Sequence, residues 1–305
     1  MELTRTQLEA IAGERLKEHR VHGGGRYTLG LPGGDRRCLL TFDTPDEART
    51  AAAALSLLRA EVDLPLPQVR ASNPGAGAGV AWVLASDLPG EPLETVAQRI
   101  PDEQLYKLGR RLGEVMHRVH RVACDRYGAL AGDDPLAADD ERGYVLGRLA
   151  AALQGVVADE LLRPEEADAV RAWFDAEFIP VGGRAALVCG GLTPATILVR
   201  QSGGSWTLSG VTQWGGALGW SPLWDHALLL DAAGASRYFS LRVGYGNAYD
   251  EATRRAYEQV REATLRPYRA LLSLERLRTL GPGPEGARRR AALLGLVSAG
   301  PSLES

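Results

Sequence analysis

The stretch that decides the fold is Leu187-Val-Cys-Gly-Gly-Leu-Thr-Pro-Ala-Thr-Ile-Leu-Val199, in which two short apolar runs flank a turn rich in glycine and threonine. This pattern predicts a strand, a loop and a second strand. The surrounding chain is unusual, because no Asp or Glu occurs between Glu177 and Asp225 although the sequence carries 38 acidic residues. The gap is typical either of a buried β-rich segment, where unpaired charge is costly, or of a site that has lost acidic chemistry.

Working outward from this stretch, hydrophobic periodicity and turn residues predict an α+β chain. A small antiparallel β lobe is expected over residues 1–87 and a larger, mainly helical lobe over residues 88–305, with a hinge near residues 85–90. The small lobe is predicted to hold a helix over Thr6–Glu18, strands over 26–31, 36–42, 65–70 and 80–85, and a helix from 43 to about 60. The large lobe is predicted to hold helices over 102–119, 139–160, 164–178, 250–261, 265–277 and 286–296, a further helix from about 223, and strands over 185–189, 196–200 and 205–213.

Composition excludes several classes of protein. The 305 residues are 45% hydrophobic and carry a net charge of −3, so a dedicated nucleic-acid binder, which is usually basic, is not expected. No apolar run reaches the length of a membrane span, and the first residues do not form a secretory signal. The three cysteines are far apart and fit neither a disulfide framework nor a tetrahedral metal site. We therefore expect a cytoplasmic protein that binds neither a membrane nor nucleic acid.

Three further strings follow the same order as those of a known family. Residues 187–199 resemble the catalytic loop of the aminoglycoside phosphotransferase and choline kinase-like family, relatives of the protein kinases. Leu208-Ser-Gly-Val-Thr-Gln-Trp-Gly-Gly216 is similar to the family's metal-binding strand, and Ser221-Pro-Leu-Trp-Asp-His-Ala-Leu228 to its Asp-Pro-x-x-Asp-Leu-Ala element. Residues 82–93 resemble the family hinge and the Pro-Gly-Glu turn that follows it. The resemblance covers about residues 20–275 and implies a two-lobed, protein-kinase-like fold.

The departures from the family pattern fall on its catalytic residues, within the degenerate loops of residues 185–216. On this alignment the family's residues fall on the following positions: the catalytic-loop His on Cys189, the base Asp on Gly191, the metal-binding Asn on Thr196, the metal-binding Asp on Gln213, the phosphate-binding Lys near Thr41, and its helix Glu partner near Ala51. A shifted register does not restore them, because no Lys lies between Lys17 and Lys107 and no Asn between Asn73 and Asn247. Only the helix Glu has a substitute nearby, since Glu47 lies one turn away.

These departures imply a pseudokinase that acts by binding a ligand or a partner. Mg²⁺ prefers anionic oxygen, which neither Gln213 nor Thr196 supplies, and loss of a general base alone lowers a rate by about 10²–10⁴. No metal and no cofactor are expected, and ATP or ADP would bind weakly and without Mg²⁺, with adenine against the hinge backbone at Ser86 and Leu88. The partner, a small molecule or a protein, stays open. The alternative is a residual or rewired ATP-dependent phosphotransferase for aminoglycosides, choline-like amines or sugars, with a carboxylate from elsewhere in the cleft.

The remaining candidate residues favour structural roles. The resemblance implies that Asp225 braces the catalytic-loop backbone. Cys189, at an apolar strand end, is expected to be inert rather than nucleophilic, and the glycines of Gly23-Gly-Gly25 to join a helix to a strand rather than to cradle phosphate. Further candidates are His117 and His120 (structural rather than metal ligands), Arg288-Arg-Arg290 (a solvated helix face rather than a docking site for an acidic partner), and Trp206, Trp214, Trp220 and Trp224 (core packing, or an aromatic-lined pocket).

Overall fold

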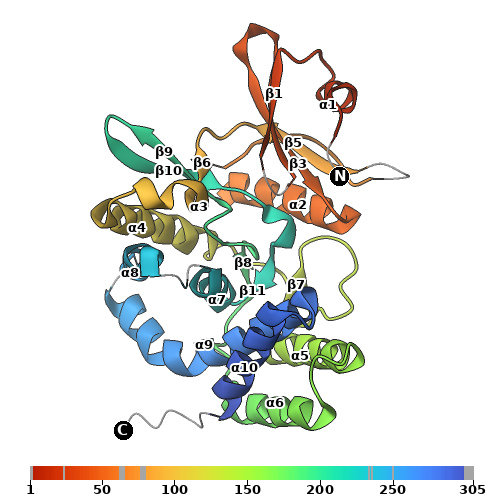
Figure 1. The fold of residues 1–305 in the computed structure, drawn as a ribbon, viewed down its shortest axis with the longest axis vertical. Coiled ribbons are helices and arrows are strands. Elements are labelled where there is room, and N and C mark those ends of the chain that lie inside the picture. Colours follow the sequence, from red (N-terminus) through yellow and green to blue (C-terminus); the bar gives the residue numbers. More distant parts are fainter. Residues whose placement is uncertain are drawn as a thin grey trace.

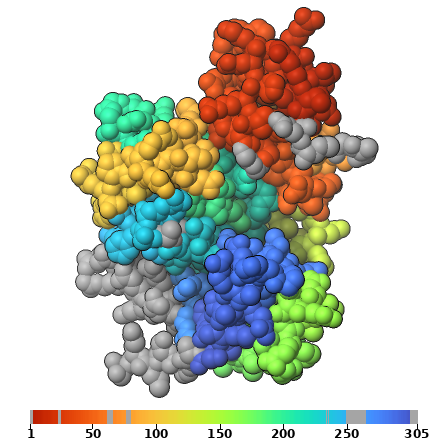
Figure 2. All heavy atoms as spheres, viewed as in Figure 1, coloured from red at the N-terminus to blue at the C-terminus, as the bar shows by residue number. Residues whose placement is uncertain are grey.

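The computed structural model describes residues 3–22, 25–61, 66–75, 80–232, 234, 236–248 and 251–298, with the backbone alone for residues 61 and 251–264. A small β-rich lobe, which holds the N-terminus, sits on a larger lobe made mostly of helices (Figure 1). Figure 2 shows the small lobe in red and orange, seated on the helical lobe. The predicted α+β, two-lobed fold is confirmed, and the predicted boundary at residues 87 and 88 falls in the connector between the strands β5 and β6.

The small lobe is one antiparallel sheet with a helix on each face. In spatial order its strands are β1 (Glu18–His22), β2 (Arg26–Gly30), β3 (Arg36–Phe42), β5 (Ala81–Ser86) and β4 (Val69–Asn73). Helix α1 (Arg5–Ala12) covers one face, where Leu8 packs with Leu29 and Leu39. Helix α2 (Pro45–Glu61) covers the other, with Ala51 and Val83 in the core that continues into the helical lobe. Side chains alternate along a strand, so the two helices bury two separate apolar sets.

The predicted first helix, Thr6–Glu18, is wrong in its second half. Helix α1 ends at Ala12 because Gly13 adopts φ 72°, a left-handed conformation that closes the helix through its N–H to the Glu9 carbonyl. Residues 18–22 instead form the edge strand β1, which the polar sequence Glu-His-Arg-Val-His does not reveal. A strand that ends at His22 and pairs with β2, rather than the predicted helix, therefore precedes the glycine run, of which Gly23 and Gly24 lie outside the described residues.

Two three-stranded sheets support the loops between the lobes. One has the order β10 (Ser205–Val211), β9 (Ile197–Ser202) and β6 (Glu91–Pro92), and the other β7 (Gly128–Ala129), β11 (Leu218–Trp220) and β8 (Ala186–Val188). The described helices of this lobe are α3 (Leu93–Val96), α4 (Asp102–Val119), α5 (Glu141–Ala158), α6 (Pro164–Glu177), α7 (Leu223–Ala232), α8 (Phe239–Gly246), α9 (Glu251–Leu280) and α10 (Pro284–Ser298). None of them is both long enough and apolar enough to cross a lipid bilayer.

Helix α9 differs from the prediction, because residues 250–261 and 265–277 were expected to form two helices. The structure has one helix of 30 residues that continues through Pro267. The run Arg288-Arg-Arg290 in α10 also differs from the predicted solvated face. Arg290 bonds Glu166 of α6, and Arg289 bonds Asp231 of α7, so two of the three arginines hold α10 against its neighbours.

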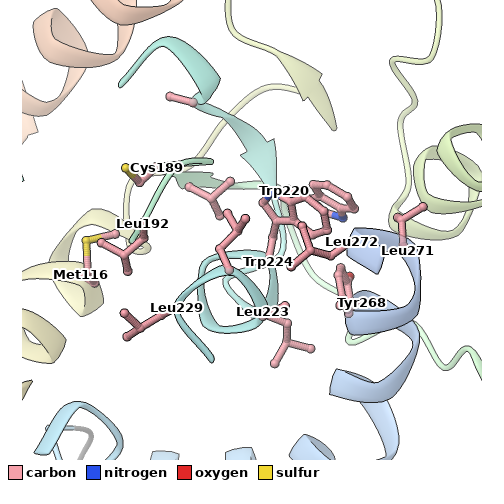
Figure 3. Close-up of a cluster of buried hydrophobic side chains, with 14 of the residues drawn as sticks. Met116, Cys189, Leu192, Trp220, Leu223, Trp224, Leu229, Tyr268, Leu271 and Leu272 are labelled. Carbon is pink, nitrogen blue, oxygen red and sulfur yellow. The ribbon is translucent and has the colours of Figure 1, made fainter. Parts of the chain in front are cut away.

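A single apolar core runs from α2 through the helical lobe. Figure 3 shows Leu192 beside Met116 of α4, and Trp220 and Trp224 beside Tyr268, with Cys189 in the same cluster. The rings of Trp220 and Trp224 stack with their centroids 4.4 Å apart. Trp214, Trp220 and Trp224 are buried, while Trp206 is half-buried, and the described residues that line the cavity between the lobes include none of the four. Core packing therefore accounts for Trp214, Trp220 and Trp224.

Candidate functional site

A cavity of about 590 Å³ lies between the two lobes. Its walls come from the hairpin of β1 and β2, the end of β3, the start of α2, and the two loops at residues 190–191 and 213–216. The described lining residues are Val21, His22, Gly25, Tyr27, Leu40, Thr41, Phe42, Asp43, Glu47, Gly190, Gly191, Gln213, Gly215 and Gly216. The structure thus brings Thr41, Gly191 and Gln213, which lie far apart in the sequence, to one cleft.

The loop after β8 is held by Asp225, which is fully buried in α7. Its Oδ2 accepts a hydrogen bond from the Cys189 amide at 2.8 Å and lies 3.0 Å from Nε2 of His120, while its Oδ1 accepts one from the Gly190 amide at 3.0 Å. At Gly190 the backbone has φ 67°, and a Cβ there would lie 1.7 Å from the Gly216 carbonyl oxygen. The two loops therefore pack backbone against backbone, in a shape that only glycine permits.

Gly191 and Thr196, the two neutral residues of this loop, are closely surrounded by backbone groups. A Cβ on Gly191 would lie 3.3 Å from the Gln213 carbonyl oxygen, closer than ordinary van der Waals contact. The buried Thr196 hydroxyl accepts from the Thr193 amide at 3.0 Å and lies within hydrogen-bond distance of the Gly191 carbonyl, at 2.9 Å. The loop itself thus uses the Thr196 oxygen as donor and acceptor.

Gln213 stands between β10 and the short helical turn Trp214–Gly216, in a left-handed conformation with φ 63° and ψ 64°. A left-handed residue other than glycine costs about 1–3 kcal/mol and persists only where its surroundings fix it. Trp214 supplies that anchor, because its ring is fully buried and its Nε1 donates to the Val211 carbonyl at 3.1 Å. Residue 213 is therefore held at the cavity wall, where it offers a neutral amide instead of a carboxylate.

The described residues that line the cavity from the small lobe include no Lys or Arg. The Thr41 hydroxyl donates to the Gly25 carbonyl at 3.0 Å, which ties β3 to the hairpin turn. The neighbours of Thr41 in β3, Leu40 and Phe42, also line the cavity and are uncharged. Ala51 is fully buried against the sheet and is not among the described lining residues.

The sequence analysis missed part of the acidic wall of this cavity. Asp43 and Glu47 both line it, and the Glu47 carboxylate accepts a hydrogen bond from the Asp43 amide at 3.1 Å. The sequence predicts a helix from residue 43, whereas α2 begins at Pro45 and Thr44 accepts from the Glu47 amide, and no sequence motif indicates that Asp43 faces a cleft. His22 lines the cavity as well; burial, followed by the charge of Arg26, lowers the pKa of its imidazole, so the ring is neutral at pH 7.

The hinge residues Ser86 and Leu88 are not among the described residues that line this cavity. The Ser86 amide donates to the Gln68 carbonyl at 2.9 Å, and its hydroxyl oxygen accepts from the Gln68 amide at 2.8 Å. The Leu88 carbonyl accepts a hydrogen bond from Nη2 of Arg26 at 3.2 Å. These hinge groups are therefore engaged by the chain itself.

Metal and thiol chemistry find no support in the described residues. They contain no group of three or more His, Cys, Asp or Glu that could hold a metal ion. All three cysteines are buried. Burial raises the pKa of Cys189 well above its ordinary value and raises those of Cys38 and Cys124 to about 11, so none is a thiolate at neutral pH.

A family model described as the phosphotransferase enzyme family matches residues 26–270. The chain belongs to this family. No curated protein matches it. Among solved structures, a thermostable mutant of aminoglycoside phosphotransferase APH(4)-Ia in ternary complex with ADP and hygromycin B is 15% identical, with a TM-score of 0.65 over 97% of this chain and 96% of that one. The GDP complex of aminoglycoside 2'-phosphotransferase-IIIa is 17% identical, with a TM-score of 0.61 over 96% and 95%.

At these identities the solved phosphotransferases show the fold alone. A third structure, the GDP and kanamycin complex of APH(2")-IIIa, is similar at the same level: it is 18% identical, with a TM-score of 0.58 over 96% of this chain and 94% of that one. The family assignment confirms the resemblance drawn from residues 187–199 and the three other strings. Whether this member transfers phosphate depends on its own residues in the cleft.

Proposed function

We propose that this member of the phosphotransferase family is a pseudokinase, which uses the cleft between its lobes to bind a ligand and does not transfer phosphate by the family's metal-dependent mechanism. One observation carries the proposal: the positions expected to hold the base and the metal ligands carry Gly191, Thr196 and Gln213. None presents an anionic oxygen, and the Thr196 hydroxyl lies within hydrogen-bond distance of the backbone of Thr193 and Gly191 in its own loop.

The chemistry of phosphoryl transfer explains why these positions matter. The reaction depends on cations that offset the phosphate charge and on a group that positions the attacking hydroxyl. Mg²⁺ is usually held by one or two carboxylates together with phosphate oxygens and water, and the neutral amide of Gln213 is a poor replacement. Restoring an acid at residue 191 would also require the loops to move, because a Cβ there meets the Gln213 carbonyl.

The same structure supports retention of a binding site. The cavity of about 590 Å³ is within the usual range for small-molecule pockets. Asp225 and the glycine contacts keep the loop shaped although its catalytic groups are absent. The ligands named for the solved relatives, nucleotides and aminoglycosides, are the first classes to test, and a nucleotide would bind weakly and without Mg²⁺. A protein partner remains the alternative occupant.

The test is a phosphotransfer assay with radiolabelled ATP or GTP and a panel of aminoglycosides, choline-like amines and sugars. We expect no transfer above the rate without protein, together with a rise in melting temperature for at least one compound, because ligand binding stabilises the folded state. Gln213→Ala serves as the matched variant. Transfer by the wild-type chain that disappears in Gln213→Ala would overturn the proposal.

A rewired phosphotransferase is the second candidate, and the acidic wall of the cavity favours it. Asp43 and Glu47 face the same space as Gln213 and could hold a cation from the small-lobe side. The double variant Asp43→Asn, Glu47→Gln distinguishes the two candidates, with the exposed neighbour Asp46→Asn as control. Transfer that is lost in the double variant and kept in the control would establish the rewired enzyme.

A further inference from the structure

Arg26 of the small-lobe sheet lies against the connector between the two lobes. It is the first residue of β2, and its side chain is only 6% exposed. Residues directly opposite in antiparallel strands share a face, so Arg26 lies on the same face of the sheet as its partner Leu40, which lines the cavity. From there its Nη2 donates to the Leu88 carbonyl at 3.2 Å and lies 3.9 Å from the Asp87 carboxylate. A side chain of the sheet thus reaches the backbone that links the two lobes.

Asp87 does not need Arg26 as a partner. Its Oδ1 accepts a hydrogen bond from the Thr28 hydroxyl at 3.3 Å, and its Oδ2 lies 3.2 Å from Nε of the exposed Arg36. The carboxylate therefore has a hydroxyl donor and a closer cation without the buried guanidinium. Arg26 is not explained by the charge of Asp87 alone.

The guanidinium of Arg26 is poorly satisfied for a buried cation. Its Nε and Nη1 are buried and have no hydrogen-bond partner among the residues that the structure describes, and the sulfur of Cys38, on the same sheet face, is at best a weak acceptor. A buried polar group without partners is unfavourable and is rare in native structures. Such a side chain is held weakly in place and can be displaced by a ligand that competes for its one backbone acceptor.

The position of this guanidinium coincides with the predicted place of a nucleotide base. The sequence assigned adenine to the backbone of Ser86 and Leu88, but Arg26 engages the Leu88 carbonyl, and Gln68 engages the amide and hydroxyl of Ser86. The open cavity lies instead toward the hairpin turn and the loops at 190–191 and 213–216. The cavity is therefore open beside the loops at residues 190–191 and 213–216, and the chain itself fills the space at the connector, residues 86–88.

We propose that Arg26 is a plug for the base-binding end of the cleft, so that a purine reaches the Leu88 carbonyl only after the guanidinium has left it. The inference rests on the proposed function in one respect, that the cleft is the ligand site. It adds that the chain disfavours purine ligands through one of its own side chains and that ligands without a planar base enter the open part unopposed.

The test is isothermal titration with adenosine, which has no phosphate and so reports on the base end alone. The wild-type chain is compared with Arg26→Ala and with Arg36→Ala, which removes the other arginine at Asp87 but leaves the plug. We expect Arg26→Ala to bind adenosine at least about tenfold more tightly than the wild type, the loss of one competing hydrogen bond to a charged donor. Arg36→Ala should bind as the wild type does.

Equal affinity of the wild type and Arg26→Ala would overturn the proposal, and so would an equal gain in Arg36→Ala. If Arg26→Ala does not fold, as judged by circular dichroism, Arg26→Gln takes its place with the same expected direction. A crystal structure of the wild-type protein with adenosine is a second test. Adenosine bonded to the Leu88 carbonyl while Arg26 keeps its place would contradict the proposal that Arg26 blocks the base. Adenosine has no group to transfer, so none of these outcomes bears on whether the chain is a pseudokinase.

Discussion

Replacing Asp225 by Asn tests whether the loop at residues 189–196 is a maintained scaffold. The substitution keeps the shape of the side chain but removes its charge and turns one oxygen into a donor. In the structure the two carboxylate oxygens face two backbone amides, at Cys189 and Gly190, and the imidazole of His120. An asparagine cannot accept from all three, because its amide nitrogen would face an N–H group.

The size of the effect follows from these contacts. Hydrogen bonds to a charged group contribute about 1.5–3 kcal/mol each, and a buried donor left without an acceptor costs about a further 1–3 kcal/mol. Because Asp225 is fully buried, solvent cannot replace the lost bonds. We expect the free energy of unfolding to fall by about 3–5 kcal/mol, which at about 2–3 °C per kcal/mol lowers the melting temperature by about 6–15 °C.

The assay combines urea denaturation with amide hydrogen exchange. Exchange at Cys189 and Gly190 should accelerate in Asp225→Asn more than exchange in the small lobe, because the lost acceptors belong to those two amides. Asp175→Asn, an exposed carboxylate on α6, is the matched control and should change stability by less than about 0.5 kcal/mol. A loss below about 1 kcal/mol in Asp225→Asn, or uniform exchange across both lobes, would refute the scaffold argument.

Three other predictions concern stability and reactivity. The pKa of Glu166 is lowered from 4.5 to about 2, and its bond to Arg290 is the largest cause. The ionised carboxylate therefore stabilises the fold fully above about pH 4.5, and this stabilisation is lost as the pH falls toward 2. The difference in free energy of unfolding between the wild type and Glu166→Gln should narrow over this range, and a constant difference would contradict the argument. Gly109→Ala, where α4 crosses α8, should lower the free energy of unfolding by about 3 kcal/mol or more, because its Cβ would lie 2.0 Å from the Leu241 carbonyl oxygen. Gly295→Ala in α10, which has open space around it, should raise the free energy of unfolding by about 0.5–1 kcal/mol. Chemical denaturation measures both variants, and equal effects would contradict the packing argument. The three buried cysteines should resist a thiol reagent in the native protein at pH 8 and all react in guanidinium chloride, and rapid native labelling would show that one thiol is accessible.

Sequence reasoning predicted the elements whose patterns are strong. Helix α4 begins and ends where the apolar spacing of residues 102–119 places it, and β3 spans the predicted residues 36–42. The strand β1 was missed because four of its five residues are exposed and only Val21 is apolar, which leaves no alternation to detect. The break predicted within α9 failed because tertiary packing holds a helix through Pro267 that local preference would interrupt.

In the candidate site, too, some features could be predicted from the sequence and others could not. Missing residue types are visible in a sequence, so the neutral character of residues 191, 196 and 213 could be predicted before the fold was known. Contacts between distant segments are not visible, because they depend on register and on loop shape. The acidic wall of Asp43 and Glu47 and the bond from Arg26 to the Leu88 carbonyl, 62 residues away, became evident only in three dimensions.

The measurement that addresses the central claim most directly is the affinity of the wild-type chain for ATP, determined by isothermal titration with excess Mg²⁺ and again with a chelator. The positions where the family holds its metal carry no anionic oxygen, so we expect no ion held between the protein and the phosphates, and the two dissociation constants should agree within about twofold. Binding that is tenfold or more tighter with Mg²⁺ would mean that carboxylates in this cleft, such as Asp43 and Glu47, hold a metal after all.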